Sequence, residues 1–171
     1  TEATITGENG QYEFTNLNPG EQYQVTFNTP DGYVVTTPNA GADDVDSDAD
    51  ENGVTPIVTL ESGEHNPTID AGIYQPASLG NYVWEDADAD GIQDPSEAPI
   101  PNVVVKLLDG NGNPVLDQND QPITTTTGAD GSYKFSGLTP GEYQVEFVAP
   151  QGYNFTTPDS GSDDAVDSDA G

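Results

Sequence analysis

The sequence predicts an all-β protein built from short strands and tight turns. In four short segments apolar and polar residues alternate with a period of two, which places Tyr, Val and Phe on one face and polar residues on the other. Nineteen Gly and fourteen Pro punctuate the 171 residues, and we find no convincing helical spacing. Many short strands at regular intervals are typical of a β-sandwich.

The individual strands and turns follow from local sequence. The alternating segments are residues 11–14, 23–27, 132–135 and 143–147. The apolar runs 56–60 and 102–108 are expected to form more deeply buried strands. GENG and GADG each precede an alternating segment and predict turns in which Gly10 and Gly131 adopt positive φ. NPGE and TPGE predict Pro-Gly turns.

The sequence contains an internal repeat. The segment that begins TITGENGQYEF recurs as TTTGADGSYKF, and both copies run on to an aspartate-rich stretch. Gly7 matches Gly128 and Asp46 matches Asp167, and both pairs are 121 residues apart, which is the length of an ordinary domain. The repeat predicts two domains joined by a short, stiff linker. Residues 1–75 are expected to be the C-terminal part of a first domain, 76–78 the linker, and 79–171 a second domain without its closing strands.

In this register each domain is incomplete. The first domain lacks its opening segment, and an incomplete sheet leaves an edge open to a strand from another chain. The alternative is a piece of a longer protein whose missing strands lie elsewhere. Residue 1 is Thr and no signal peptide is present, so we expect an internal or processed piece.

The charge of the chain argues against several classes of function. Thirty-one Asp and Glu stand against two basic residues, Lys106 and Lys134, which gives a net charge of -29. Nucleic acids and anionic membranes are bound through basic residues, and no apolar run approaches the ~20 residues of a membrane-spanning helix. With no Cys and a single histidine, His65, oxygen ligands remain, which favours calcium or magnesium. The acidity also indicates divalent cations, a saline habitat, or both.

The stretch DADADGIQDPSE matches the calcium loop D-x-D-x-D-G-x-x-x-x-x-E. This pattern provides carboxylates at alternate positions, a sharp turn at glycine, one backbone carbonyl, an aspartate that acts through water, and a closing bidentate glutamate. The predicted ligands are Asp86, Asp88, Asp90, Ile92, Asp94 and Glu97. A solvated acidic turn is the alternative, but it would not require six matched positions. The flanks GNYVW and APIP are not helical, so we expect a calcium loop on a β-domain rather than a helical sensor.

Two further aspartate clusters accompany the repeat. Each contains a D-S-D unit whose two carboxylates lie on one side of an extended segment. The additional predicted ligands are Asp46, Asp48, Asp167 and Asp169, and the clusters also contain Asp43, Asp44, Asp50, Asp163 and Asp164. Neither unit closes a coordination shell alone, so we expect partners from the same domain or from the domain junction. A solvated acidic loop is again the alternative.

Three other residues stand out. Asp70 is expected either as a metal ligand or as a turn residue with satisfied hydrogen bonds, His65 on a surface loop, and Trp84 in the core. Carboxylate pairs can serve a glycosidase, but these carboxylates cluster in loops with metal spacing. Because no Ser-His-Asp order, phosphate loop or Cys nucleophile is present, we expect no enzyme.

Three motifs carry a family resemblance, namely LGNYVWEDADADGIQDPSEAPIPNVVVKLLD, GADGSYKFSGLTPGEYQVEF and DSDADENGVTPIVTLESGEHNPTIDAGIY. They closely resemble the B-repeat domains of bacterial serine-aspartate-repeat adhesins, over nearly the whole chain. The resemblance implies tandem Cna-B-like, immunoglobulin-like β-sandwiches that bind structural calcium. It also implies a place in the stalk of a secreted protein on the bacterial cell surface. The implied partners are calcium ions and neighbouring repeats or identical chains, without nucleic acid or direct membrane insertion.

Related Cna-B domains often carry a Lys-Asn isopeptide cross-link. Here LGNYVWED has no Lys and TIDAGIY has Asp70 and no Asn, so we predict no such bond and expect calcium to stiffen the fold instead. The functional expectation is a calcium-rigidified structural repeat. The alternatives are an extracellular filament subunit assembled by strand donation, and a glycan- or protein-binding adhesin module, which would need an exposed aromatic patch.

Overall fold

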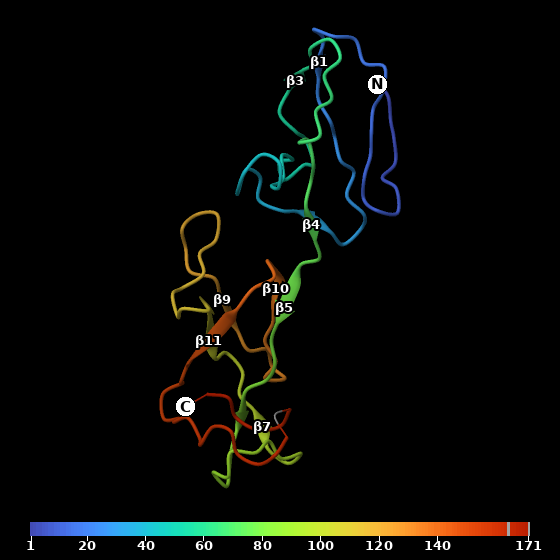
Figure 1. Ribbon diagram of the computed structural model, residues 1–171. Coiled ribbons are helices and arrows are strands. Elements are labelled where there is room, and N and C mark those ends of the chain that lie inside the picture. The colour runs from blue at the N-terminus through green and yellow to red at the C-terminus, as the bar shows by residue number, and fades with distance from the viewer. Residues whose placement is uncertain (164, 171) are drawn as a thin grey trace. The chain divides into compact units, whose positions relative to one another are not determined.

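The computed structural model, which describes residues 1–163 and 165–170, divides the chain into two compact units. Unit 1 is Thr1–Gln75 and unit 2 is Pro76–Gly171. In Figure 1 unit 1 runs from blue to green and unit 2 from green to red. The described residues form strands, turns and irregular segments, which confirms the predicted all-β class. They include no helix that is long and apolar enough to cross a membrane.

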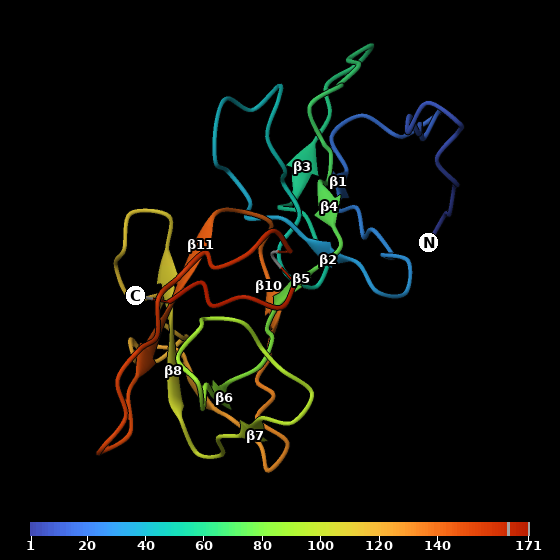
Figure 2. The same cartoon turned by 90° about the horizontal axis from the view of Figure 1, so that it is seen from below.

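Unit 2 is organised around a three-stranded antiparallel sheet (Figure 2). β8 (Val104–Asp109) pairs with β11 (Tyr143–Val148) on one side and with β9 (Thr124–Thr126) on the other. Val105 and Leu107 on β8 are fully buried, so the apolar run predicted to be a buried strand is the central strand of this sheet.

Two smaller pairings complete unit 2. β5 (Ala77–Leu79) pairs with β10 (Phe135–Leu138), so the first strand of the unit begins within the residues predicted as a linker. β6 (Trp84–Glu85) pairs with β7 (Ala98–Pro99) and forms a hairpin around the predicted calcium loop. The core of the unit consists of Val105, Leu107, Phe135 and Leu138, with partly buried residues such as Leu79 and Phe147 packed against them.

Unit 1 has shorter strands than the sequence predicts. β1 (Gln22–Tyr23) pairs with β3 (Val58–Thr59), and β2 (Val34–Val35) pairs with β4 (Ile73–Tyr74). The alternating segment 11–14 is not a strand, so that prediction is wrong. Alternation provides an apolar face, but a strand also needs a neighbour with which to pair, and in the described part of unit 1 no strand lies beside this segment.

The two units share an aromatic cluster and a turn. Tyr12 meets Phe14 and Phe27 edge to face, with ring centroids 5.9 and 5.3 Å apart. In unit 2 Tyr133 meets Phe135 and Phe147 in the same way, at 6.2 and 5.4 Å. The turns before both clusters contain glycines with the predicted positive φ, 80° at Gly10 and 79° at Gly131. The repeat in the sequence is therefore also a repeat in structure.

Candidate metal centre

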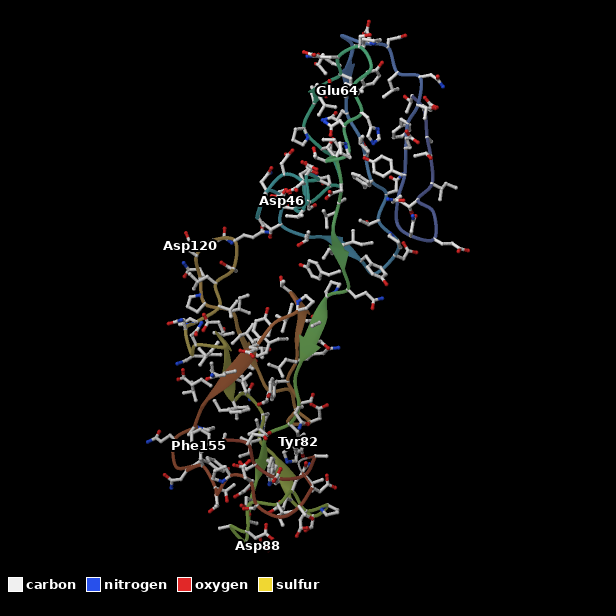
Figure 3. All side chains as sticks on the ribbon, viewed as in Figure 1. Asp46, Glu64, Tyr82, Asp88, Asp120 and Phe155 are labelled. Atoms are coloured by element: carbon white, nitrogen blue, oxygen red, sulfur yellow. The ribbon has the colours of Figure 1, made fainter. Side chains whose placement is uncertain are left out.

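The calcium-loop sequence closes the β6–β7 hairpin of unit 2. Glu85 lies opposite Ala98 in the hairpin, so the first and last positions of the loop, Asp86 and Glu97, are brought together by the backbone. The hairpin is held to the rest of the unit by bonds from the Val83 N–H to the Gly131 carbonyl and from the Ile100 N–H to the Val83 carbonyl, both 2.9 Å. In Figure 3 Asp88 lies at the outer end of this hairpin.

Three carboxylates of the loop converge. Asp86, Asp88 and Glu97 each offer an oxygen, and these oxygens lie within 4.8 Å of one another. Both Glu97 oxygens accept backbone hydrogen bonds, one from Ala87 N–H at 2.7 Å and one from Asp94 N–H at 2.9 Å. Oxygen-only groups of this kind suit a hard cation such as calcium.

The other predicted loop ligands lie outside this group of three. Asp90 accepts the Ile92 N–H at 2.8 Å, and the Asp94 carbonyl accepts the Glu97 N–H at 3.0 Å, so both act as turn residues. The Ile92 backbone forms a β-bridge with Asp167. Coordination by Asp90, Ile92 and Asp94 remains a prediction.

The conformation of the loop depends on two residues with positive φ. Ala89 has φ of 60° and Gly91 has φ of 82°. The Gly91 N–H donates to an Asp86 carboxylate oxygen at 2.9 Å, which fixes that carboxylate inside the turn. A side chain at position 91 would collide with Ser160 and with the Thr157 carbonyl, 2.5 Å from the ideal Cβ position. Only glycine therefore fits both the backbone conformation and the space.

The electrostatics of the three carboxylates are unequal. The hydroxyl of Thr156 donates to Asp86 at 2.5 Å, and this bond, with backbone N–H groups of the loop, lowers the pKa of Asp86. The neighbouring Asp90 carboxylate raises the pKa of Asp88, with smaller contributions from desolvation and Asp86. Asp88 therefore experiences repulsion that a bound cation would relieve. Sequence reasoning missed Thr156, because nothing in the spacing of TTPDSG shows that it lies beside Asp86.

The D-S-D unit of unit 2 runs alongside the loop. In addition to the Ile92–Asp167 bridge, Gln93 N–H donates to the Val166 carbonyl at 2.6 Å and Ser168 N–H to the Gly91 carbonyl at 3.1 Å. The backbones are therefore adjacent, although the carboxylates of Asp167 and Asp169 do not belong to the converging group of described residues. Asp164 lies outside the described residues.

The D-S-D unit of unit 1 meets Asp70. The Asp70 N–H donates to an Asp48 carboxylate oxygen at 2.9 Å, and the Asp48 N–H donates to the Asp70 carbonyl at 3.0 Å. Asp46 and Asp70 line a cavity of about 560 Å³, into which the acidic segment and the strand before β4 both contribute. Desolvation raises the pKa of Asp70, and the carboxylates of Asp48 and Asp46 raise it further.

Other predicted candidates play separate roles. One Asp50 oxygen accepts backbone N–H groups from Asn52 and Val54, both at 2.9 Å, and these bonds lower the pKa of Asp50. It is a turn residue in the structure. His65 is exposed, as expected for a surface loop.

Replacing Asp70 by Asn is expected to stabilise unit 1 in the absence of calcium. The folded-state pKa of Asp70 is raised, so folding is weakened as the pH rises through that pKa and regains the lost stability as the pH falls. The Asn variant keeps the backbone bonds to Asp48 and removes this dependence. We expect a melting temperature a few degrees above wild type at pH 7 in chelator, with the difference vanishing near pH 4. Asp44→Asn, an exposed change in the same segment, is the matched control, and an equal gain from it would contradict the assignment.

Comparison with known proteins gives a consistent result. A family model described as SdrD B-like domain matches residues 1–73 and 77–171. Serine-aspartate repeat-containing protein F of Staphylococcus epidermidis is 48% identical over 166 residues, which cover 96% of this chain and 9% of that protein. Serine-aspartate repeat-containing protein D of Staphylococcus aureus (strain Newman) is 44% identical over 165 residues, 95% of this chain and 12% of that protein. The chain therefore spans about a tenth of the length of these curated relatives.

Proposed function

Because the chain belongs to the SdrD B-like domain family, we propose that it is a non-catalytic structural repeat of a secreted bacterial cell-surface protein, stiffened by calcium. The observation that carries the calcium part of this proposal is the convergence of Asp86, Asp88 and Glu97 at the closed end of a β-hairpin. The position on the cell surface and the role in an adhesin are inferred from the family resemblance of the sequence.

Calcium would act here by cancelling repulsion and closing the loop. In a chain of net charge -29 the three carboxylates are held together by backbone N–H groups and one hydroxyl rather than by basic side chains. One basic residue of the same unit, Lys106, is instead engaged with Glu146 at 2.7 Å on the three-stranded sheet. A cation at the loop would fix Asp86 and Glu97, and with them the ends of β6 and β7, in one arrangement.

The D-S-D units are proposed as further calcium ligands. Asp46, Asp48 and Asp70 would serve unit 1, and Asp167 and Asp169 would serve unit 2 next to the loop. The support is the close pairing of Asp48 with Asp70 in one unit and of Asp167 with Ile92 in the other. Each additional ion would reduce the charge repulsion that the sequence places in these segments.

Trypsin provides a selective test of stiffening, because both basic residues of the chain, Lys106 and Lys134, lie in unit 2. Lys106 lies in the central strand β8, so cleavage there requires the unit to open. With a dissociation constant of ~0.5 mM, typical of extracellular modules, about 5 mM calcium would reduce the open population roughly tenfold. We expect cleavage to slow by this factor and to recover in chelator.

The matched variants for this assay are Asp88→Asn and Glu142→Gln. Both remove one negative charge from an exposed side chain of unit 2, but only Asp88 belongs to the converging group. Calcium should protect Glu142→Gln as it protects wild type and should fail to protect Asp88→Asn. Equal protection of the two variants, or no protection of wild type, would sink the proposal that this loop stiffens the unit.

A further inference from the structure

The shared segment of the two units is covered in unit 1 and uncovered in unit 2. The covering element in unit 1 is the stretch 66–74, NPTIDAGIY, whose last residues form β4. The Tyr12 hydroxyl donates to the Ile69 carbonyl at 2.6 Å, and the Thr36 N–H donates to the Gly72 carbonyl at 2.9 Å. β4 then pairs with β2 through Val34–Tyr74 and Val35–Ile73.

Unit 2 contains the acceptors of this stretch but, among its described residues, not the stretch itself. By repeat alignment Tyr133 corresponds to Tyr12, Phe155 to Val35, Thr156 to Thr36, and Asp169 to Asp48. Asp48 is 6% exposed, whereas Asp169 is an exposed residue. Val35 is half-buried, whereas Phe155 is 48% exposed.

A cavity of about 640 Å³ lies where the covering stretch would run. Its aromatic lining comes from both ends of unit 2, and Figure 3 labels Tyr82 and Phe155 among these residues. The aromatic residues that line it are Tyr82, Trp84, Tyr133, Phe147, Tyr153 and Phe155. Trp84 stacks on Tyr82 with ring centroids 6.4 Å apart, and its indole N–H is buried without a hydrogen-bond partner among the described residues. Trp84 was expected in the core, and it is only half-buried because the strand that would cover it is missing.

The other half of the closing segment shows the same difference. In unit 1 the Phe27 N–H donates to the Gly53 carbonyl at 2.7 Å, and the Val25 carbonyl accepts the Thr55 N–H at 3.0 Å. The counterparts of Val25 and Phe27 are Val145 and Phe147 on β11, and the described residues of unit 2 provide no equivalent partner on that side. Both the cavity and this edge therefore correspond to positions that the stretch 53–74 covers in unit 1.

We infer that the aromatic cavity of unit 2 is a docking groove for an extended strand of sequence 66–74, supplied in trans by a further copy of the repeat. Register and chemistry follow from unit 1. The Ile69 carbonyl accepts the Tyr133 hydroxyl, and the Gly72 carbonyl accepts the Thr156 N–H. Ile73 runs beside Phe155. The strand carries one carboxylate, Asp70, so it approaches this acidic chain with little repulsion.

Such docking is strand addition between copies. It would connect one copy to the next through unlike surfaces, which builds linear assemblies rather than closed dimers. An aromatic cavity of this size could also hold a small glycan. The strand is favoured because the same positions of the shared segment are covered by that strand in unit 1.

The test uses the full chain and a fluorescein-labelled peptide of residues 64–75 in calcium-containing buffer. Trp84 is the one tryptophan of the chain and the peptide has none, so tryptophan emission reports the cavity directly. We expect saturable binding by fluorescence anisotropy, with a blue shift of Trp84 emission at the same midpoint. Tyr133→Phe should weaken binding about fivefold, because one hydrogen bond is lost.

Two matched controls fix the location and the register. Tyr12→Phe makes the same change in unit 1 and should leave the affinity for the added peptide unchanged. A peptide with Gly72→Val should bind at least tenfold more weakly, because a Cβ at Gly72 lies 2.6 Å from the Thr36 methyl carbon in unit 1 and Thr156 stands in its place in unit 2. Absence of a Trp84 response, equal weakening by Tyr12→Phe, or a response to oligosaccharides with none to the peptide would each overturn the inference.

Discussion

Calcium is expected to raise the melting temperature of unit 2 by on the order of 5–10 °C, and Glu97→Gln is expected to abolish this rise. At ~5 mM calcium a site with a dissociation constant of ~0.5 mM stabilises the folded state by about 1.4 kcal/mol, and a domain of this size gains roughly 4–8 °C per kcal/mol. Glu97 is the residue to change because both of its oxygens are fixed by backbone N–H groups at the two ends of the loop.

The measurement is thermal unfolding followed by Trp84 fluorescence, because Trp84 immediately precedes the loop in β6. Wild type and Glu97→Gln are compared in calcium, in magnesium and in chelator. Magnesium should give a smaller rise in wild type, since it demands a tight octahedral site and holds its water more firmly. A rise of equal size in Glu97→Gln would place the stabilising ion elsewhere in the chain.

Replacing Gly91 by Ala is expected to destabilise unit 2 by about 2–3 kcal/mol. The residue has φ of 82°, and an added Cβ would lie 2.5 Å from the Thr157 carbonyl oxygen. The substitution therefore forces the loop away from the segment that follows Thr156, and it also breaks the geometry that gathers Asp86 with Glu97. Calcium binding should weaken together with stability.

Gly112→Ala in the same unit is the control for this substitution. Gly112 has φ of 81°, but the nearest atom to its ideal Cβ position, the Gln144 side-chain oxygen, is 4.0 Å away. It should cost about 1 kcal/mol through backbone strain alone and leave calcium binding intact. Chemical denaturation of both variants measures the difference. If the two variants lose the same stability, the loop does not pack against residues 157–160 in solution.

The strands of unit 2 could be predicted from the sequence because each of them has a neighbour. Residues 143–147 alternate, and β11 forms opposite the apolar strand β8. The same alternation at 11–14 in unit 1 gives no strand, because the described residues provide nothing beside it with which to pair. Periodicity describes one face of a strand, whereas pairing depends on what the rest of the fold places next to it.

The candidate site could be predicted to a similar degree. Spacing along one loop identified Asp86, Asp88 and Glu97, because a loop of that length returns on itself within the hairpin. The hydroxyl of Thr156 and the pairing of Asp70 with Asp48 could not be predicted, because both bring together residues that are distant in sequence. The aromatic cavity could not be predicted either, since it exists where a strand of the other repeat has no counterpart in the described residues.

The most direct test of the central claim, that the β6–β7 loop holds calcium, is a residue-resolved NMR titration of the full chain. The amides of Ala87, Gly91 and Asp94 donate to the carboxylates of Asp86 and Glu97, so they sense any ion at this site. We predict that these three amide resonances shift together and saturate with a dissociation constant of ~10⁻⁴–10⁻³ M, and that Asp88→Asn removes the effect. Calcium-induced shifts confined to other parts of the chain, or none at all, would contradict the account.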